Sequence, residues 1–256
     1  MGDVLFGKVA LVTGGSTGIG LETVRLFLAE GARVLIAGRD AERGRAALAA
    51  LGAESGDLRF ARCDVRSGEN CRAAVGEAVA AFGRLDILFN NAGVIHVNRS
   101  VVDTPEEEWD DDLAVNLKGV FLMSRWAVPA MASGGGGSIV NNASIFGLVG
   151  GSGVAAYCAA KGAVVNLTRA MAIDHAGQGI RVNCVCPGSV DTPMLAAEME
   201  DLGGRSIQEP KFAARHPLGR IATPVEVARA VLFLASDAAS FVTGAALPVD
   251  GGRSAW

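Results

Sequence analysis

Short runs of Val, Ile and Leu alternate along the chain with longer segments in which apolar residues recur at helical spacing. This alternation is typical of a parallel β-sheet whose two faces are covered by helices. The intervening segments are about ten to thirty residues long, which suits the crossover connections of parallel strands. We therefore expect seven strands, at Val9–Thr13, Arg33–Ala37, Leu58–Cys63, Ile87–Asn90, Ser138–Ala143, Ile180–Val185 and Ala245–Val249.

The alternation continues without a linker or a low-complexity stretch, which predicts a single domain over residues 1–256. Two helix starts, at Thr104 and Thr223, share the order threonine, proline and glutamate that favours a threonine N-cap. Residues 192–220 differ, because prolines and a glycine pair divide them into short amphipathic pieces such as Met194–Leu202. Such a stretch is typical of a mobile lid over a binding site, although a solvated loop can have the same composition.

The composition fits a globular protein and excludes several other classes. Half of the residues are hydrophobic and the net charge is −4, which argues against disorder and against nucleic-acid binding. Glycine makes up 34 of the 256 residues but lacks the three-residue period of collagen. No apolar run reaches the roughly 20 residues of a membrane helix, and the N-terminus lacks the pattern of a signal peptide. We therefore expect a cytoplasmic protein that binds neither a membrane nor nucleic acid.

The cysteines and histidines show no spacing typical of metal ligands or of a CxxC pair. The chain has five cysteines, and an odd count in a chain of this size argues against a disulfide framework. Cys184 and Cys186 stand two apart in a predicted strand, which places both on one face as small buried apolar groups. The sequence therefore predicts no metal site and no redox pair.

A glycine-rich turn joins the first predicted strand to the helix after it. Gly14 would permit a tight turn, Gly18 would let the backbone approach a pyrophosphate, and Gly20 would let the helix pack on the strand. The spacing GxxxGxG is not that of a P-loop and no lysine follows Gly20, which argues against hydrolysis of nucleoside triphosphates. Its position after the first strand indicates a dinucleotide-binding loop.

The end of the second predicted strand bears on the choice of dinucleotide. An acidic residue there would bind the ribose 2′-hydroxyl and repel a 2′-phosphate. Gly38 occupies that position and Arg39 follows, which offers a planar cation to a phosphate. This arrangement favours NADP. Asp40 and the lack of a basic residue at Ser16 and Thr17 leave NAD as the alternative.

The only tyrosine of the chain, Tyr157, precedes Lys161 by four residues, so the two side chains share one face of a helix. A phenol has a pKa of about 10, so its anion acts as a base near pH 7 only with roughly 4 kcal/mol of stabilisation. One cation about 4 Å away supplies about that much at an effective dielectric constant of about 20. Ser144 follows a predicted strand, at the edge where open α/β sheets bind ligands. Together they indicate an acid/base site.

Five motifs in order resemble those of the short-chain dehydrogenase/reductase family over nearly the whole chain: TGGSTGIG, NNAG, the serine at position 144, YCAAK and PGSVDT. The resemblance implies a three-layer, doubly wound Rossmann-like domain with a seven-stranded parallel sheet. It further implies reversible hydride transfer between NAD(P) and an alcohol or a ketone, and a homotetramer.

The resemblance also assigns roles to single residues. Tyr157 would be the acid/base group, Lys161 would lower its pKa and hold the nicotinamide ribose, and Ser144 would bind the reacting oxygen. Asn116 would hold a water behind Lys161, although an asparagine inside a helix can also simply bond to the backbone. With the glycine loop and Arg39, the expected cofactor-binding residues are Gly14, Ser16, Thr17, Gly18, Ile19, Gly20, Arg39, Asp64, Val65, Asn91, Ala92, Gly93, Tyr157, Lys161, Pro187, Gly188, Val190 and Thr192.

Other functions share parts of this pattern. An enoyl reductase would have its lysine further from the tyrosine, and a sugar epimerase or dehydratase would carry a larger C-terminal domain. A catalytically idle NAD(P)-binding sensor or scaffold would lack part of the tetrad, whereas a 3-oxoacyl-thioester reductase would share it. The sequence therefore predicts an NAD(P)-dependent alcohol dehydrogenase or ketone reductase, with those last two functions as alternatives.

The residues expected around the substrate are mostly apolar and include no clustered arginines. They are Ile95, His96, Ile145, Phe146, Val149, Gly150 and Met194. This composition favours a neutral, moderately hydrophobic alcohol or ketone over a phosphorylated or carboxylated one. His96 would either orient a substrate oxygen or have a structural role.

Overall fold

The computed structural model describes residues 3–52 and 56–255. Seven parallel strands form one sheet in the order β3-β2-β1-β4-β5-β6-β7, which confirms the predicted sheet. The ends of the strands differ from the predicted ones by two residues at most. The strands are β1 (Val9–Thr13), β2 (Arg33–Gly38), β3 (Leu58–Arg62), β4 (Ile87–Asn90), β5 (Gly137–Asn142), β6 (Ile180–Pro187) and β7 (Ala246–Val249).

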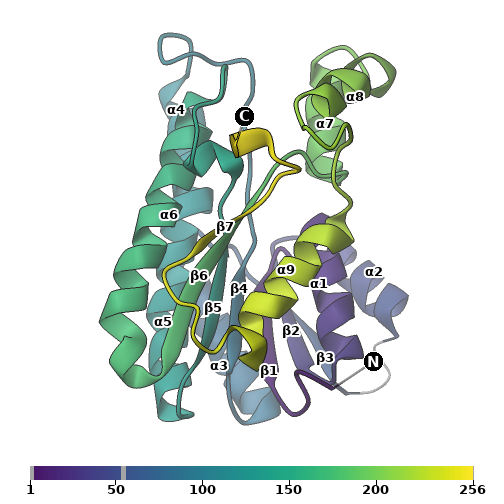
Figure 1. Cartoon of the computed structure of the whole chain (residues 1–256). Helices are drawn as coiled ribbons and strands as arrows, with labels where there is room; N and C mark the ends of the chain where they lie inside the picture. The colour runs from purple at the N-terminus through teal and green to yellow at the C-terminus, as the bar shows by residue number, and fades with distance from the viewer. Residues whose placement is uncertain (1–2, 53–55, 256) are drawn as a thin grey trace.

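Helices cover both faces of this sheet and complete the three layers of a Rossmann-like fold (Figure 1). Leu11 and Val12 are neighbours in β1, yet they belong to apolar clusters on opposite faces, and both are fully buried. The uninterrupted apolar run of β1 follows from this double burial. The helices are α1 (Gly18–Ala29), α2 (Ala41–Leu51), α3 (Gly68–Phe82), α4 (Glu106–Leu113), α5 (Gly119–Ser133), α6 (Ala155–His175), α7 (Pro193–Asp201), α8 (Arg205–Ala214) and α9 (Pro224–Ala235).

One of the two predicted N-caps is confirmed. Thr223 precedes α9, and the Glu226 carboxylate accepts the Thr223 backbone N–H at 2.8 Å. The prediction for Thr104 is wrong, because α4 begins one residue later, with Pro105 as its N-cap. The Thr104 hydroxyl donates instead to the carbonyl of Ser100 at 2.7 Å, in the turn before the helix.

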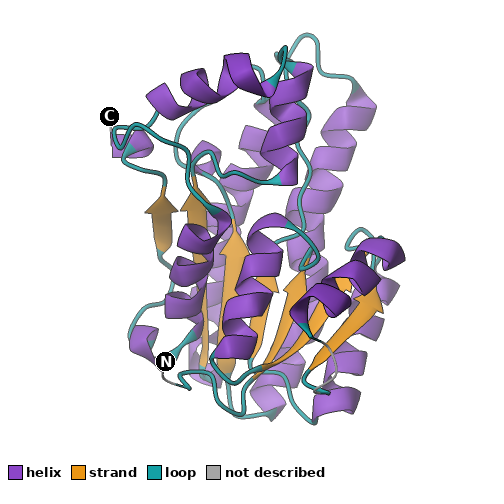
Figure 2. Ribbon diagram, turned by 90° about the vertical axis from the view of Figure 1, so that its right-hand side faces the viewer, coloured by secondary structure: helices purple, strands orange, loops and turns teal. Residues whose placement is uncertain are grey.

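The segment predicted as a lid contains α7 and α8, which are joined at Gly203 and Gly204. Both glycines have positive φ, 108° and 103°, which a side chain would strain. The two helices project beyond the carboxyl ends of the strands, toward which all the arrows point (Figures 1 and 2). Their mobility remains a prediction, as do the domain limits, since Met1 and Trp256 lie outside the described residues.

The two cysteines of β6 behave as predicted. Cys184 and Cys186 are fully buried in one apolar cluster with Val164 and Val165 of α6. All five cysteines are free thiols. In the described part of the chain, no helix combines the length and the apolar character needed to cross a bilayer.

Candidate active site

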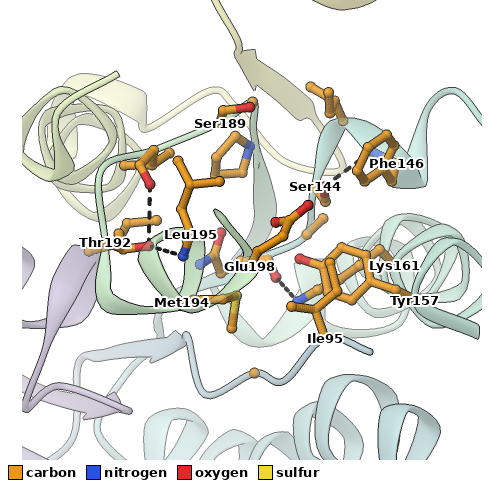
Figure 3. A pocket seen from close by; sticks show the side chains of 18 of the residues that line it. Ile95, Ser144, Phe146, Tyr157, Lys161, Ser189, Thr192, Met194, Leu195 and Glu198 are labelled. Atoms are coloured by element: carbon orange, nitrogen blue, oxygen red, sulfur yellow. Dashed lines mark hydrogen bonds between the residues drawn. The ribbon is translucent and has the colours of Figure 1, made fainter. Parts of the chain in front are cut away.

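A pocket opens at the carboxyl ends of β4, β5 and β6, near the point where the strand order reverses between β1 and β4. Figure 3 shows α7 on one side of this pocket and Tyr157 and Lys161 of α6 on the other. Ten of the predicted site residues line it, and all five motifs contribute. They are Ile19, Asn91, Gly93, Ser144, Tyr157, Lys161, Pro187, Gly188, Val190 and Thr192.

Ser144 is held at the end of β5, where it caps a single 3₁₀ turn, Ile145–Gly147. Its Oγ accepts the backbone N–H of Phe146 at 3.2 Å (Figure 3). The capping bond fixes the serine side chain, which lies on the pocket surface. The Phe146 ring in turn meets the Tyr157 ring edge to face, with centroids 6.5 Å apart. The turn therefore positions Ser144 directly and packs against the ring of Tyr157.

Tyr157 and Lys161 are both buried, with exposed fractions of 9% and 3%. Burial raises the pKa of Tyr157 above its ordinary value, and a hydrogen bond with Ser144 opposes that effect. Burial likewise lowers the pKa of Lys161 to about 8. The expected lowering of the pKa of Tyr157 by Lys161 stays a prediction, and in the protein alone the net shift is upward. Burial dominates there, and the Lys161 ammonium donates to the Asn142 carbonyl at 2.8 Å.

Asn116 lies in a π-helical turn, Ala114–Lys118, between α4 and α5. Its Oδ1 accepts the Val94 N–H at 3.2 Å and its Nδ2 donates to the Val94 carbonyl at 2.9 Å. A Cβ atom built on Gly93 would lie 3.0 Å from Asn116 Oδ1 and 3.8 Å from Lys161 Nζ. Asn116 therefore bonds to the backbone, as one interpretation expected, and lies near Lys161, while its holding of a water stays a prediction.

Sequence reasoning missed a buried carboxylate behind Asn116. Asp112 is fully buried, and its Oδ1 accepts Asn116 Nδ2 at 3.0 Å. Its Oδ2 lies 3.3 Å from His96 Nδ1. Burial raises the pKa of Asp112, and His96 opposes this. Its position four residues before Asn116, on the same helix face, was the available signal.

The glycine loop has the tight geometry expected of it. Gly14 and Gly18 have positive φ, 63° and 53°, and a Cβ atom on Gly20 would lie 2.3 Å from the Gly14 carbonyl. Asn91 ties this loop to β4, because its Nδ2 donates to the carbonyls of Thr13 and Gly14 at 3.1 and 3.2 Å. Gly14, Ser16, Thr17, Gly18, Gly20 and Ala92 lie beside the pocket without lining it.

The remaining predicted cofactor residues follow β2 and β3, outside the pocket. Arg39 is exposed, and the Asp40 carboxylate caps α2 by accepting the N–H groups of Glu42 and Arg43. Asp64 pairs with Arg66 at 2.6 Å, which keeps its pKa below the usual range. Val65 packs against Gly119, where a Cβ atom would approach it to 2.7 Å.

The prediction for the substrate region is correct in part. Ile95, Ile145, Phe146 and Met194 line the pocket. His96, Val149 and Gly150 do not, and His96 contacts Asp112 instead.

The expectation of no clustered arginines is wrong. Arg215, which follows α8, and Arg253, three residues before the C-terminus, line the pocket together with Glu198 of α7. These residues lie far apart in the sequence, so no local pattern brings them together.

Comparison with known proteins gives full-length relatives. A family model described as enoyl-(acyl carrier protein) reductase matches residues 14–254. The 2,5-dichloro-2,5-cyclohexadiene-1,4-diol dehydrogenase of Sphingobium indicum is 43% identical, over 98% of this chain and 98% of that protein. The meso-2,3-butanediol dehydrogenase of Serratia marcescens is 44% identical over 97% and 95%. The crystal structure of levodione reductase superposes with a TM-score of 0.94 at 35% identity, covering 98% of this chain and 99% of the other.

Proposed function

The chain belongs to the short-chain dehydrogenase/reductase family and is an NAD(P)-dependent oxidoreductase of alcohol and ketone groups, and we propose that it interconverts small secondary alcohols and ketones with Tyr157 as the acid/base group. The observation that carries this proposal is the placement of the Tyr157 and Ser144 side chains on one pocket, beside apolar Ile95 and Met194. The separation of Tyr157 and Lys161 favours alcohol chemistry over the enoyl reduction in the family model's description.

The two hydroxyl groups handle the proton and the charge on the reacting oxygen. In ketone reduction Ser144 donates a hydrogen bond to the carbonyl oxygen, and Tyr157 gives that oxygen its proton as negative charge develops. The raised pKa of Tyr157 suits this donor role, because the phenol stays protonated at neutral pH. In alcohol oxidation the deprotonated form of Tyr157 accepts the proton of the alcohol hydroxyl. When bound, the nicotinamide cofactor accepts or supplies the hydride.

The described residues fit such a cofactor. Asn142 Oδ1 is buried at the pocket and has no hydrogen-bond partner in the described part of the chain, so it is available to a ligand donor. Gly18, at the start of α1, has positive φ and lies against Thr192, so its missing side chain leaves the backbone N–H groups of the helix start accessible to a pyrophosphate. We assign the cofactor to the predicted residues, with Lys161 holding the nicotinamide ribose and Asn116 holding a water behind Lys161.

We also propose NADP as the preferred cofactor. Arg39 is exposed at the end of β2, and Asp40 is committed to capping α2, which removes the nearest acidic acceptor for a ribose 2′-hydroxyl. Arg39→Asp is expected to lower the ratio of kcat/KM for NADPH over NADH by about tenfold or more. Arg45→Asp, on the exposed surface of α2, is the matched control. A parent enzyme that prefers NADH, with a ratio that Arg39→Asp does not move, would refute this assignment.

The substrate proposal is tested by a panel followed at 340 nm with both cofactors. Cyclic and short-chain secondary alcohols are expected to be oxidised, and their ketones reduced. An acetoacetyl thioester in the same panel tests the 3-oxoacyl-thioester alternative. Failure with every member, together with retained cofactor binding, would favour the idle NAD(P)-binding alternative. We further propose a homotetramer, which light scattering of the purified protein would test.

A further inference from the structure

Three charged side chains line the pocket apart from Tyr157, Lys161 and Ser144. We call this group the lid wall: Glu198, Arg215 and Arg253, with the aromatic rings of Phe146 and Phe212. Figure 3 shows Glu198 reaching from α7 toward Ser144 and Tyr157. Across the residues that the structure describes, none of the three charged groups forms an ion pair. These charges lie on the substrate pocket and the mechanism above does not use them.

Aromatic rings hold both arginines in place without neutralising them. The Arg253 guanidinium lies over the Phe146 ring, 5.0 Å from its centroid, and one of its N–H groups lies 3.4 Å from Ser189 Oγ. The Arg215 guanidinium lies over the Phe212 ring at 4.5 Å. Burial lowers the pKa of Arg253, and the charge of Arg215 lowers it further. The Arg253 guanidinium therefore has two contacts that hold it, and the two guanidinium groups repel each other.

The single carboxylate of the lid wall does not balance these two charges. Burial raises the pKa of Glu198, and the attraction of Arg215 and Arg253 only partly offsets this. Of the charged groups that line the pocket here, two are cations and one is an anion, and the Asp250 carboxylate acts on Arg253 from outside the pocket. Arg253 is half-buried and Arg215 is exposed beside it, and neither forms an ion pair within the described residues, so an anionic ligand group in the pocket would pair with both.

We propose that Arg215 and Arg253 bind a carboxylate carried by the alcohol substrate; this inference rests on the proposed function. The Phe146 ring contacts the Arg253 guanidinium on one side and the Tyr157 ring on the other. Because Tyr157 and Arg253 both contact Phe146, we expect a small ring or a short chain between the reacting carbon and the carboxylate. This substrate class replaces the neutral one that the apolar sequence pattern favoured.

The first experiment compares three alcohols that differ at one group, using the enzyme with saturating NADP: cyclohexanol, 4-hydroxycyclohexanecarboxylate and the corresponding 4-carboxamide. The carboxamide has the shape of the carboxylate without its charge. We expect kcat/KM for the carboxylate to exceed that for the carboxamide by at least about tenfold. Equal values for the two, or turnover of cyclohexanol without turnover of the carboxylate, would overturn the proposal.

Variants of the lid wall separate binding from a merely structural role. Arg253→Gln and Arg215→Gln should each lower the ratio of carboxylate to carboxamide kcat/KM about tenfold, and Arg253→Lys should restore part of it. Glu198→Gln should raise the same ratio, because it removes a negative charge from the site. Arg45→Gln on α2 is the control and should leave the ratio unchanged. If the variants only lost packing, the ratio of carboxylate to carboxamide kcat/KM would change little in each of them. The arginine variants and Glu198→Gln would then not change it in opposite directions.

A binding measurement distinguishes failure of this inference from failure of the proposed function. Cyclohexanecarboxylate has no hydroxyl group to oxidise, so calorimetric titration of the enzyme with it reports the anion site alone. Binding that Arg253→Gln weakens about tenfold supports the site even where no alcohol of the panel is turned over. Undetectable binding to the parent enzyme, or equal binding to the variant, contradicts it.

Discussion

The two sides of the pocket hold their charged groups in opposite ways. Behind α6, Lys161, Asn116 and Asp112 are buried, and each has a protein partner between 2.8 and 3.2 Å away. On the lid wall, Glu198 and Arg215 are bound to no charged partner in the described parts of the chain. Groups that perform the same step on every substrate gain from fixed partners, because their geometry is set in advance. Groups that recognise one substrate, such as the lid-wall arginines in our proposal, gain from having no protein ion pair, because their charge is then available to the substrate.

The largest expected effect is that of Tyr157→Phe, on the α6 side. The change removes the proton-transferring oxygen and keeps the ring that packs on Phe146. We expect kcat to fall by about 10³-fold, and equally for neutral and carboxylated alcohols, because the proton step is common to both. Steady-state kinetics on both substrates measures this. Full turnover by the purified variant would show that the proton passes elsewhere.

The single tyrosine offers an optical check on the same residue. Any phenolate absorbance in the protein comes from Tyr157, because the chain has no other tyrosine. Burial places its pKa above the ordinary value of 10.0, so titration of the protein without cofactor should show no phenolate near neutral pH. A phenolate signal at pH 7 in that form would contradict the burial argument.

The next effect in size is that of Asp112→Asn. The amide keeps an oxygen for Asn116 Nδ2 and removes only the charge, which raises the pKa values of both Lys161 and Tyr157. Without it, Lys161 loses its proton at a pH below its present value of about 8, and Tyr157 ionises more readily. The whole pH profile of alcohol oxidation should therefore move to lower pH. On the acid limb of the profile, where Lys161 stays protonated, the rate should rise about fivefold, for a coupling of about 1 kcal/mol.

The measurement is kcat against pH with saturating cofactor and cyclohexanol, for the parent and the variant. His96→Gln is the companion variant, because it changes the outer partner of Asp112 and leaves the carboxylate in place. A lower rate at every pH without a change in the position of the profile would mean that Asp112 only holds Asn116.

On the α6 side Tyr157, Lys161 and Ser144 could be predicted from the sequence, whereas the lid wall could not. Tyr157 and Lys161 are one helical turn apart, and Ser144 ends a strand, so short-range patterns locate them. Arg215 and Arg253 follow different elements, and only the tertiary fold brings them to one pocket. The electrostatics of Tyr157 also escaped the sequence, because the depth of its burial decides whether its pKa rises or falls.

The smallest expected effect is on stability. It tests whether the lid wall, unlike the α6 side of the pocket, contributes little to the free energy of unfolding. Arg215 is exposed and donates no side-chain hydrogen bond within the described residues, so Arg215→Gln should change the free energy of unfolding by less than about 0.5 kcal/mol. The loss of the Phe212 contact and the relief of repulsion with Arg253 oppose each other. Calorimetry should show a Tm within about 2 °C of the parent.

Asp112→Ala is the comparison variant on the α6 side. It leaves the buried Asn116 amide short of an acceptor and should lower the free energy of unfolding by about 1–3 kcal/mol. Equal losses for the two variants would mean that the lid wall holds the fold together, and its free charges would then be no sign of a substrate.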